Sequence, residues 1–144
     1  MSTERRRERE HSAGGVVVRG EETIVIIPTR RTATGRQVLA LPKGHVDPGE
    51  SEPEAAAREV REEAGVEAEL VEKLGDVRYW YQRNGMRIAK VVSFYLFDYR
   101  EGDPADHDAE VEVARWVPLE QAARELSYRG EREMVRRALE RVRR

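Results

Sequence analysis

The chain begins its apolar pattern with short β-branched runs. Valine and isoleucine dominate residues 14–19 and 23–27, and a glycine with two glutamates separates these runs. Runs of this kind, bounded by turn residues, predict two strands joined by a tight connection. A polar loop then leads into residues 37–41, which we expect to form a third short strand. Residues 42–50 contain two glycines and two prolines and are expected to form a loop.

One predicted helix is marked at both ends. Ser51 is followed three residues later by Glu54, the signature of a capping box, and Gly65 is a typical helix stop. We therefore expect residues 52–64 to be helical. The apolar residues that fall on one face of this helix are Ala56, Ala57, Val60 and Ala64.

The second half of the chain predicts strands followed by helices. Residues 67–81 and 86–99 have the pattern of two longer strands, and the Asn-Gly pair at 84–85 is a strong hairpin signal. Residues 111–117 alternate like a strand, and residues 119–126 favour a helix. This order favours a mixed sheet covered by helices over a regular βαβ repeat. An amphipathic terminal helix is predicted by the spacing of Val135, Ala138, Leu139 and Val142.

Length and composition narrow the class of protein. A chain of 144 residues fits one domain, and we expect a mobile charged arm at residues 1–10 followed by a single domain over residues 11–144. Lysine and arginine number 26 against 28 acidic residues, so no dedicated nucleic-acid binding is expected. Apolar stretches are too short to span a bilayer and no signal peptide is evident, which favours a cytoplasmic protein without membrane contact. The absence of cysteine excludes disulfides, zinc-thiolate sites, iron-sulfur clusters and thiol nucleophiles.

Three carboxylates converge on the predicted helix. Glu59, Glu62 and Glu63 stand at i, i+3 and i+4, within an arc of roughly 100°. Like charges at these spacings each cost roughly 0.2–0.5 kcal/mol in an isolated helix, a conflict that a divalent cation would remove. Alternatively, the acids form a solvated flank on which Arg58 and Glu62 make an i, i+4 pair. The arc lies beside the apolar face, however, where the sheet or the loop near residue 44 could enclose it.

The ligand types indicate a hard cation. Without cysteine and without an obvious histidine ligand, a carboxylate cluster suits Mg²⁺ or Mn²⁺. Such ions keep waters and recruit substrate phosphates as further ligands, so the pattern points to phosphate chemistry. Glu50, which ends the preceding loop, is expected to reach the same region as an indirect partner.

The segment from loop to helix resembles the Nudix box of the Nudix hydrolases at every defined position. It reads GHVDPGESEPEAAAREVREEAGV, and its defined positions are Gly44, Glu50, Arg58, Glu59, Val60, Glu62, Glu63, Gly65 and Val66. The segments SAGGVVV, LPKGHVDPGE, KVVSFYLF and RWVPLEQA are also similar to this family in order and spacing, so the resemblance extends over residues 12–122.

The resemblance implies a fold, a reaction and a set of ligands. The fold is an α/β/α sandwich with a central mixed β-sheet, and the reaction is hydrolysis of nucleoside diphosphates linked to another moiety with Mg²⁺ or Mn²⁺. By the same analogy Glu59, Glu62 and Glu63 hold the metal together with the carbonyl of Gly44, and Arg58 orients the glutamates.

The family pattern implies one more acid, from the loop before the RWVP strand. Glu110 is the best match and Glu112 is a plausible substitute. In some relatives this acid is the general base and in others it only binds metal, so its role stays open. The alternative interpretation is that Glu110 is an ordinary loop acid, like Asp106 and Asp108 nearby.

Two residues before the helix are candidate phosphate contacts. Lys43 can offer phosphate oxygens a point charge, and His45 can act as a hydrogen-bond donor or a proton shuttle. The alternatives are an exposed lysine and a histidine that caps a loop. The string PKGHVDPGE resembles the hydrolases of diadenosine polyphosphates and related compounds.

An aromatic and basic patch follows the box. Aromatic faces can stack on a base while cations hold a phosphate tail, and a downstream tyrosine near this distance is typical of the dinucleoside polyphosphate group. Core or cross-strand packing is the alternative for aromatic residues in a strand. The candidate substrate-binding residues in this patch and the next strand are Arg78, Tyr79, Tyr81 and Lys90.

The first functional hypothesis is a hydrolase of dinucleoside polyphosphates, from diadenosine tetraphosphate to hexaphosphate. The rivals are a MutT-like pyrophosphatase of oxidised or noncanonical nucleoside triphosphates and, third, an ADP-ribose pyrophosphatase. A small-molecule nucleotide is the expected partner, with a monomer or homodimer as the assembly. A different class remains open, a non-catalytic nucleotide-sensing or RNA-interacting module. Its candidate contacts on the terminal helix are Arg132, Arg136, Arg137, Arg141, Arg143 and Arg144.

Overall fold

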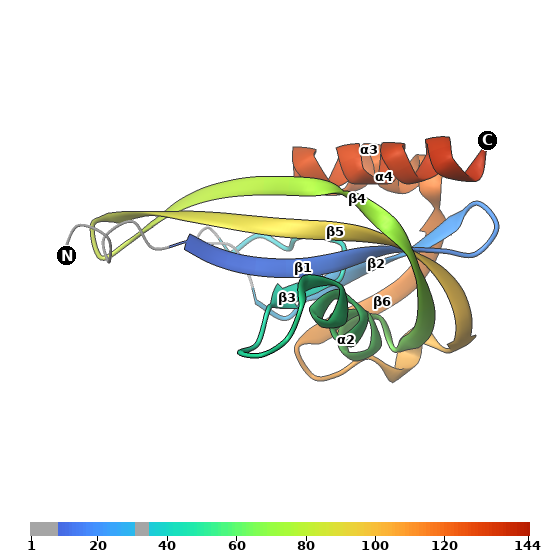
Figure 1. Ribbon diagram of the computed structural model, residues 1–144, viewed down its shortest axis with the longest axis horizontal. Coiled ribbons are helices and arrows are strands. Elements are labelled where there is room, and N and C mark those ends of the chain that lie inside the picture. Colours follow the sequence, from blue (N-terminus) through green and yellow to red (C-terminus); the bar gives the residue numbers. More distant parts are fainter. Residues whose placement is uncertain (1–8, 31–34) are drawn as a thin grey trace.

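A four-stranded mixed sheet forms the centre of the protein. The computed structural model describes residues 9–30 and 35–144 (Figure 1). Strand order is β3-β1-β5-β4, in which β1 is parallel to β5 and the other neighbours are antiparallel. The bounds of these strands are β1 Arg9–Val18, β3 Lys43–His45, β4 Val66–Arg83 and β5 Met86–Gly102.

A separate antiparallel pair joins β2 (Glu22–Pro28) to β6 (Val111–Pro118). Its register pairs Thr23 with Val117 and shifts between Ile27 and Pro28. The register places Val111, the first residue of β6, opposite Pro28, the last residue of β2.

Helices cover both faces of the central sheet (Figure 1). One helix, α2 (Glu52–Ala64), packs on one face, while α3 (Leu119–Glu125) and α4 (Arg129–Val142) lie on the opposite face. A short 3-10 turn, Pro104–Asp106, follows β5. The expected α/β/α sandwich with a mixed sheet is therefore confirmed. Within the described residues, no helix is long and apolar enough to cross a membrane.

Two apolar clusters hold these layers together. On one side Ala56 and Val60 of α2 pack with Phe97 of β5. On the other side Val135 of α4 packs with Phe94 of β5. Burying a valine or phenylalanine side chain contributes about 1.5–3 kcal/mol, so α2 and α4 are fixed against the same strand from opposite faces.

The predicted start and stop of α2 are both present. Ser51 Oγ accepts a hydrogen bond from Glu54 N at 3.2 Å, and Glu54 Oε1 accepts from Ser51 N at 2.8 Å. Gly65 ends the helix with a φ of 72°, in the left-handed region that favours glycine. The hairpin is confirmed as well, because Asn84 and Gly85 have φ values of 52° and 75° between β4 and β5.

Residues 37–41 do not form the expected strand. Only Ala40 pairs, in an isolated bridge with Ile26, because the backbone groups on either side have other partners. Leu39 N donates to Ser127 Oγ at 2.9 Å, and Leu41 N donates to Glu131 Oε1 at 2.8 Å. The expected loop 42–50 in turn contains the short strand β3.

The expected arm, residues 1–10, mostly lies outside the described residues. Its last two residues belong to β1, which begins at Arg9. Within this strand Glu10 accepts hydrogen bonds from Tyr81 Oη at 2.6 Å and from Arg83 Nη2 at 3.0 Å. The start of β1 is thereby attached to the end of the β4-β5 hairpin.

Candidate active site

Glu59 and Gly44 bring α2 and β3 into direct contact. Glu59 is buried, with 8% of its surface exposed, and its carboxylate lies over the backbone of Gly44. A Cβ atom at position 44 would stand 2.1 Å from Glu59 Oε2, so only glycine fits there. The local sequence therefore places one carboxylate of the box beside the backbone of the preceding loop, as the helix projection predicts.

Arg58 fixes the acids around it. Its guanidinium donates to Glu50 through Nε at 2.8 Å and through Nη2 at 3.0 Å, and it donates to the carbonyl of His45 at 2.9 Å. Nη1 donates to Glu59 Oε2 at 2.9 Å and to Glu62 Oε1 at 3.2 Å. The pairing lowers the pKa of Glu50 to about 2. The structure thus brings Arg58 to Glu62 at the expected i, i+4 spacing and to Glu50 as well.

The charge of Glu63 is compensated by a backbone N–H, whereas the guanidinium of Arg58 compensates Glu50, Glu59 and Glu62. Its Oε1 accepts a hydrogen bond from Lys43 N at 2.9 Å. Burial nevertheless raises the pKa of Glu63 to about 8 and also raises the pKa of Glu59. Burial raises a carboxyl pKa because the charged form is poorly solvated. A cation held between these two carboxylates would reverse that penalty.

The chemistry of this donor set fits a hard divalent cation. Buried carboxylate oxygens and a neighbouring backbone carbonyl are the ligands that Mg²⁺ and Mn²⁺ prefer. Among residues 9–30 and 35–144, no group of three or more His, Asp or Glu side chains is arranged as a complete metal site. Instead, Arg58 holds one oxygen of Glu59 and one of Glu62.

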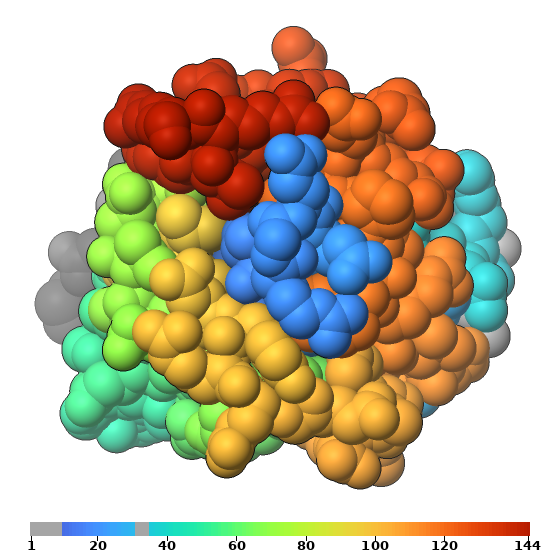
Figure 2. Space-filling model, turned by 90° about the vertical axis from the view of Figure 1, so that its right-hand side faces the viewer, coloured from blue at the N-terminus to red at the C-terminus, as the bar shows by residue number. Residues whose placement is uncertain are grey.

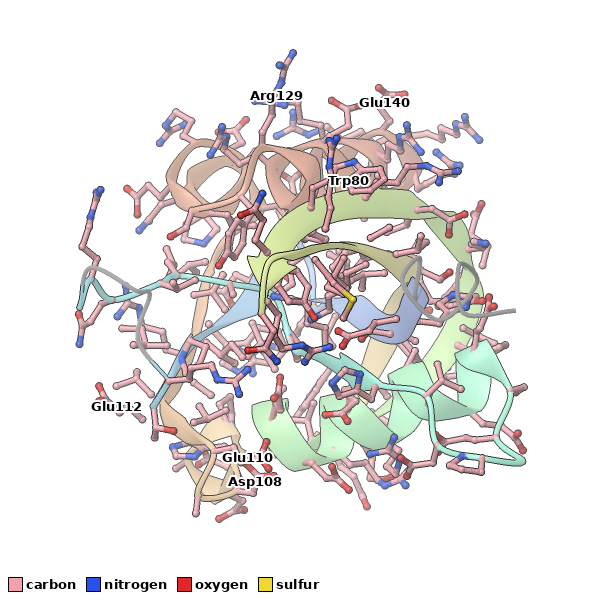
Figure 3. All side chains as sticks on the ribbon, turned by 90° about the vertical axis from the view of Figure 1, so that its left-hand side faces the viewer. Trp80, Asp108, Glu110, Glu112, Arg129 and Glu140 are labelled. Atoms are coloured by element: carbon pink, nitrogen blue, oxygen red, sulfur yellow. The ribbon has the colours of Figure 1, made fainter. Side chains whose placement is uncertain are left out.

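The loop before β6 brings further acids to α2. Asp108 N donates to the carbonyl of Glu62 at 2.8 Å, and Asp108 Oδ1 accepts from Glu110 N at 3.0 Å. The charge of Glu110 contributes to the raised pKa of Glu59. In Figure 3, Asp108 and Glu110 lie next to the end of α2, whereas Glu112 points away from it and accepts a hydrogen bond from Gln37. The geometry favours Glu110 over Glu112 as the additional acid.

The sequence analysis assigned no role in the site to Asp108. Its charge contributes to the raised pKa of Glu63. The signal was its place two residues before Glu110, in a loop already expected to reach the site.

The Lys43 side chain does not stand free in the site. Its ammonium pairs with Glu131 Oε2 at 2.8 Å and lies 5.3 Å from the centroid of the Tyr128 ring. Tyr79 Oη also donates to Glu131 Oε2, at 2.8 Å. Two of the candidate substrate contacts are therefore joined through a buried acid, Glu131, which sequence reasoning missed.

Lys90 is a candidate cation whose surroundings differ from those of Lys43. Within the part of the chain that the structure describes, no acid pairs with its ammonium. Burial and the nearby charge of Lys43 lower the pKa of Lys90, as expected for a cation in a positive, poorly solvated place. Arg30 adds to this positive field. A phosphate group is the kind of ligand that would relieve it.

The other candidate contacts are placed differently. Tyr81 donates its hydroxyl to Glu10, and the side chain of His45 is exposed. Arg78 lines a separate groove of about 530 Å³ between β4 and α4, together with Arg129 and Glu133. The structure therefore does not bring Arg78 to the box carboxylates.

Comparison with known proteins decides the family. A sequence profile described as the NUDIX domain matches residues 9–138. The chain belongs to the NUDIX family. Residues 44–66 are therefore the Nudix box of a NUDIX domain, and α2 is its helix.

Several named proteins are similar to this NUDIX domain. A putative mutator protein MutT4 of Mycobacterium tuberculosis is 35% identical over 93% of this chain and 56% of that protein. An 8-oxo-(d)GTP phosphatase of Mycolicibacterium smegmatis is 38% identical over 71% of this chain and 30% of that protein. A mouse bis(5'-nucleosyl)-tetraphosphatase is 34% identical over 56% of each. The NUDIX domain thus spans about half or less of the length of these relatives.

Solved structures share the fold. A NUDIX hydrolase from Nitrosomonas europaea has a TM-score of 0.75 at 20% identity, covering 92% of this chain and 90% of that one. An Ap4A hydrolase binary complex from C. elegans has a TM-score of 0.67 at 23% identity, covering 93% and 98%. These likenesses confirm the NUDIX fold.

Burial of Glu63 predicts a pH-dependent stability of the metal-free protein. Its folded pKa of about 8 lies above the ordinary value of 4.5, so the folded state holds more protons than the unfolded state between these values. The free energy of unfolding is therefore expected to be highest below pH 4.5 with respect to this group and to fall as pH rises to about 8. Urea unfolding in EDTA across this range measures the slope.

Glu63→Gln is the matched comparison. Since the variant carries no titrating carboxyl at this position, its stability should decline less between pH 5 and pH 8. Parallel profiles for the wild type and Glu63→Gln would show that the carboxyl does not titrate in this range.

Proposed function

We propose that the protein is a divalent-metal-dependent hydrolase that cleaves a phosphoanhydride bond in nucleotides, with dinucleoside polyphosphates as the preferred substrates. The carrying observation is that Glu59 lies over the Gly44 backbone while Glu63 accepts from the neighbouring Lys43 N, and that burial raises both carboxyl pKa values. Relatives named as hydrolases of nucleotides support the same reaction class.

In this proposal Glu59, Glu63 and the carbonyl of Gly44 hold Mg²⁺ or Mn²⁺, with Glu62 and Glu110 completing the acidic set. The bound ion supplies Lewis-acid polarisation and lowers the pKa of a coordinated water. Arg58 fixes Glu59 and Glu62 by direct hydrogen bonds, which limits the rotamers of both carboxylates. Glu110 serves either as a metal ligand or as the base that takes a proton from water.

Lys90 supplies the phosphate contact. We place the phosphate between Lys90 and the carboxylate site, because the charge of Lys43 acts on Lys90 while the Lys43 backbone N–H donates to Glu63. Tyr81 and Glu10, joined by a hydrogen bond of 2.6 Å, border the same region and offer an aromatic face with a polar edge for a nucleoside. His45, with an exposed side chain beside the box, remains a candidate donor to the phosphate chain.

A second candidate function is a pyrophosphatase of oxidised nucleoside triphosphates. The similarity to the mutator protein MutT4 extends over 93% of this chain, more than the 56% covered by the tetraphosphatase. Incubation with Mg²⁺ and a nucleotide panel, with product chromatography, separates the two functions. Release of a nucleoside triphosphate from diadenosine tetraphosphate supports the first, and monophosphate plus pyrophosphate from 8-oxo-dGTP supports the second. Failure to turn over any nucleotide would contradict both.

Several arginines of α4, and Arg143 just after it, have partners within the domain. Arg132 donates to the carbonyl of Leu126 at 2.7 Å, and Arg137 donates to the carbonyl of Leu74 at 2.8 Å. Arg143 pairs with Glu21 at the β1-β2 turn, which α4 borders in Figure 2. These bonds hold the terminal helix against the domain, so we do not propose an RNA-interacting role for it.

Neutralising Lys90 should weaken substrate binding. We expect Lys90→Gln to raise KM by about 10-fold, because a hydrogen bond to a charged group contributes about 1.5–3 kcal/mol. The kcat should change less, since Lys90 does not touch the box carboxylates. Steady-state kinetics on the best nucleotide of the panel measures both constants.

Lys73→Gln is the control for Lys90→Gln. Lys73 is exposed and pairs with Asp76 at 3.0 Å, on a part of β4 that the proposed substrate does not reach. Unchanged KM in Lys90→Gln, or an equal increase in both variants, would contradict the assignment of Lys90.

A further inference from the structure

Glu131 is a buried acid with three donors. It lies on the first turn of α4 and is 0% exposed. Oε1 accepts from Leu41 N at 2.8 Å, while Oε2 accepts from Tyr79 Oη and pairs with Lys43 Nζ, both at 2.8 Å. A buried carboxylate without such partners would be strongly unfavourable, so these contacts are mutually dependent.

Two of these donors belong to the short segment that leads to Gly44. Leu41 and Lys43 lie on either side of Pro42, which has no N–H to donate. Glu131 therefore holds the segment through one backbone atom and one side chain. Other elements fix the same residues, since Pro42 O accepts from Gly15 N at 3.1 Å and Lys43 N donates to Glu63 Oε1 at 2.9 Å.

This arrangement connects the two helical layers through β3. Helix α4 contacts the segment by way of Glu131, and α2 contacts it by way of Glu63 and Glu59. The helices lie on opposite faces of the sheet (Figure 1). The segment that leads to Gly44 is thus held from both helical layers, and Glu131 is its contact with α4.

We propose that Glu131 is a positioning residue for the metal site, which acts by holding residues 41–43 so that the Gly44 carbonyl faces Glu59 and Glu63. The inference rests on the proposed function, because it assigns Gly44 and the two glutamates as ligands. Both the charge and the length of the Glu131 side chain are needed for these contacts. A glutamine has a single acceptor oxygen, so it keeps the contact with Leu41 N only by turning its NH₂ group toward the Lys43 ammonium, which that group repels. If the oxygen faces Lys43 instead, the contact with Leu41 N is lost.

Mn²⁺ affinity of Glu131→Gln tests the role without any substrate. Free Mn²⁺ is measured by electron paramagnetic resonance in titrations of the wild-type protein, Glu131→Gln and Glu140→Gln. Glu140 is the matched control because it is exposed on the same helix (Figure 3). We expect Glu131→Gln to bind Mn²⁺ about 10- to 100-fold more weakly, the range typical of groups that orient metal ligands, and Glu140→Gln to bind as the wild type.

A second readout follows the segment directly. Amide hydrogen exchange at residues 43–45 should accelerate in Glu131→Gln, because the Lys43 side chain loses its anchor. Circular dichroism and thermal unfolding establish that the variant is folded. A folded Glu131→Gln with wild-type Mn²⁺ affinity would overturn the proposal.

The double variant Lys43→Met with Glu131→Gln covers the case in which the single variant does not fold. Removing both charges together leaves no unpaired buried ion, so the fold should be retained. Loss of the Lys43 anchor should weaken Mn²⁺ binding as in the single variant, and wild-type affinity would overturn the proposal. Wild-type protein that binds no Mn²⁺ would overturn the proposed function as well, whereas equal affinity in wild type and variant overturns only the role of Glu131.

Discussion

Glu59→Gln is expected to lower kcat by roughly 10²- to 10⁴-fold, because losing a ligand of the divalent ion removes several kcal/mol of transition-state charge stabilisation. The buried carboxylate beside Gly44 would no longer offer a charged ligand to the divalent ion. The fold should be spared or stabilised, because burial raises the pKa of Glu59 and a neutral amide removes that penalty. Steady-state kinetics with Mg²⁺, together with thermal unfolding in EDTA, measures the two effects.

Glu67→Gln is a suitable control for Glu59→Gln. Glu67 follows α2 closely in the sequence, is exposed, and lies 3.6 Å from Arg61 in a surface pair. Such pairs contribute about 0–1 kcal/mol, so neither activity nor stability should change appreciably. A Glu59→Gln variant that unfolds at lower temperature and keeps its kcat would show that Glu59 has a structural role only.

Gly44→Ala should also weaken the metal site, although it adds only a single methyl group. The new Cβ would stand 2.1 Å from Glu59 Oε2 and 2.2 Å from Glu59 Cδ, so the carboxylate must move. We expect Mn²⁺ affinity to fall at least about 10-fold, as for other changes that displace a metal ligand. Isothermal titration calorimetry with Mn²⁺ measures the loss.

Gly20→Ala controls for the loss of a glycine. Gly20 lies in the turn between β1 and β2, where a Cβ would meet nothing within 4 Å, although its φ of 61° is strained for alanine. This variant should lose some stability and keep its Mn²⁺ affinity. Equal affinity in Gly44→Ala and Gly20→Ala would contradict the close approach of Glu59 to Gly44.

The parts of the structure that sequence reasoning predicted are set by local interactions. The capping box at Ser51 and the glycine stop at Gly65 fix α2, and the helical period alone then places Glu59 and Glu63 on one face. The Asn84-Gly85 turn fixes the β4-β5 hairpin in the same way. These features needed no knowledge of the tertiary fold.

The features that were missed depend on packing between distant segments. Residues 37–41 are apolar enough for a strand, but Ser127 and Glu131 take the hydrogen bonds that a neighbouring strand would make. Lys43 was expected to face phosphate, and its partner Glu131 lies 88 residues later in the chain. A signal for Glu131 did exist, because it stands four residues before Val135 and seven before Ala138, within the apolar stripe of α4.

The central claim is that Glu59 and Glu63, with the Gly44 carbonyl, hold a hard divalent ion. An anomalous difference map from a crystal soaked in Mn²⁺ tests it most directly. We expect a peak about 2.0–2.4 Å from oxygens of both carboxylates and of Gly44, within the range of hard-cation bonds to oxygen. A map in which Mn²⁺ binds elsewhere, while Glu59 stays paired with Arg58, would contradict it.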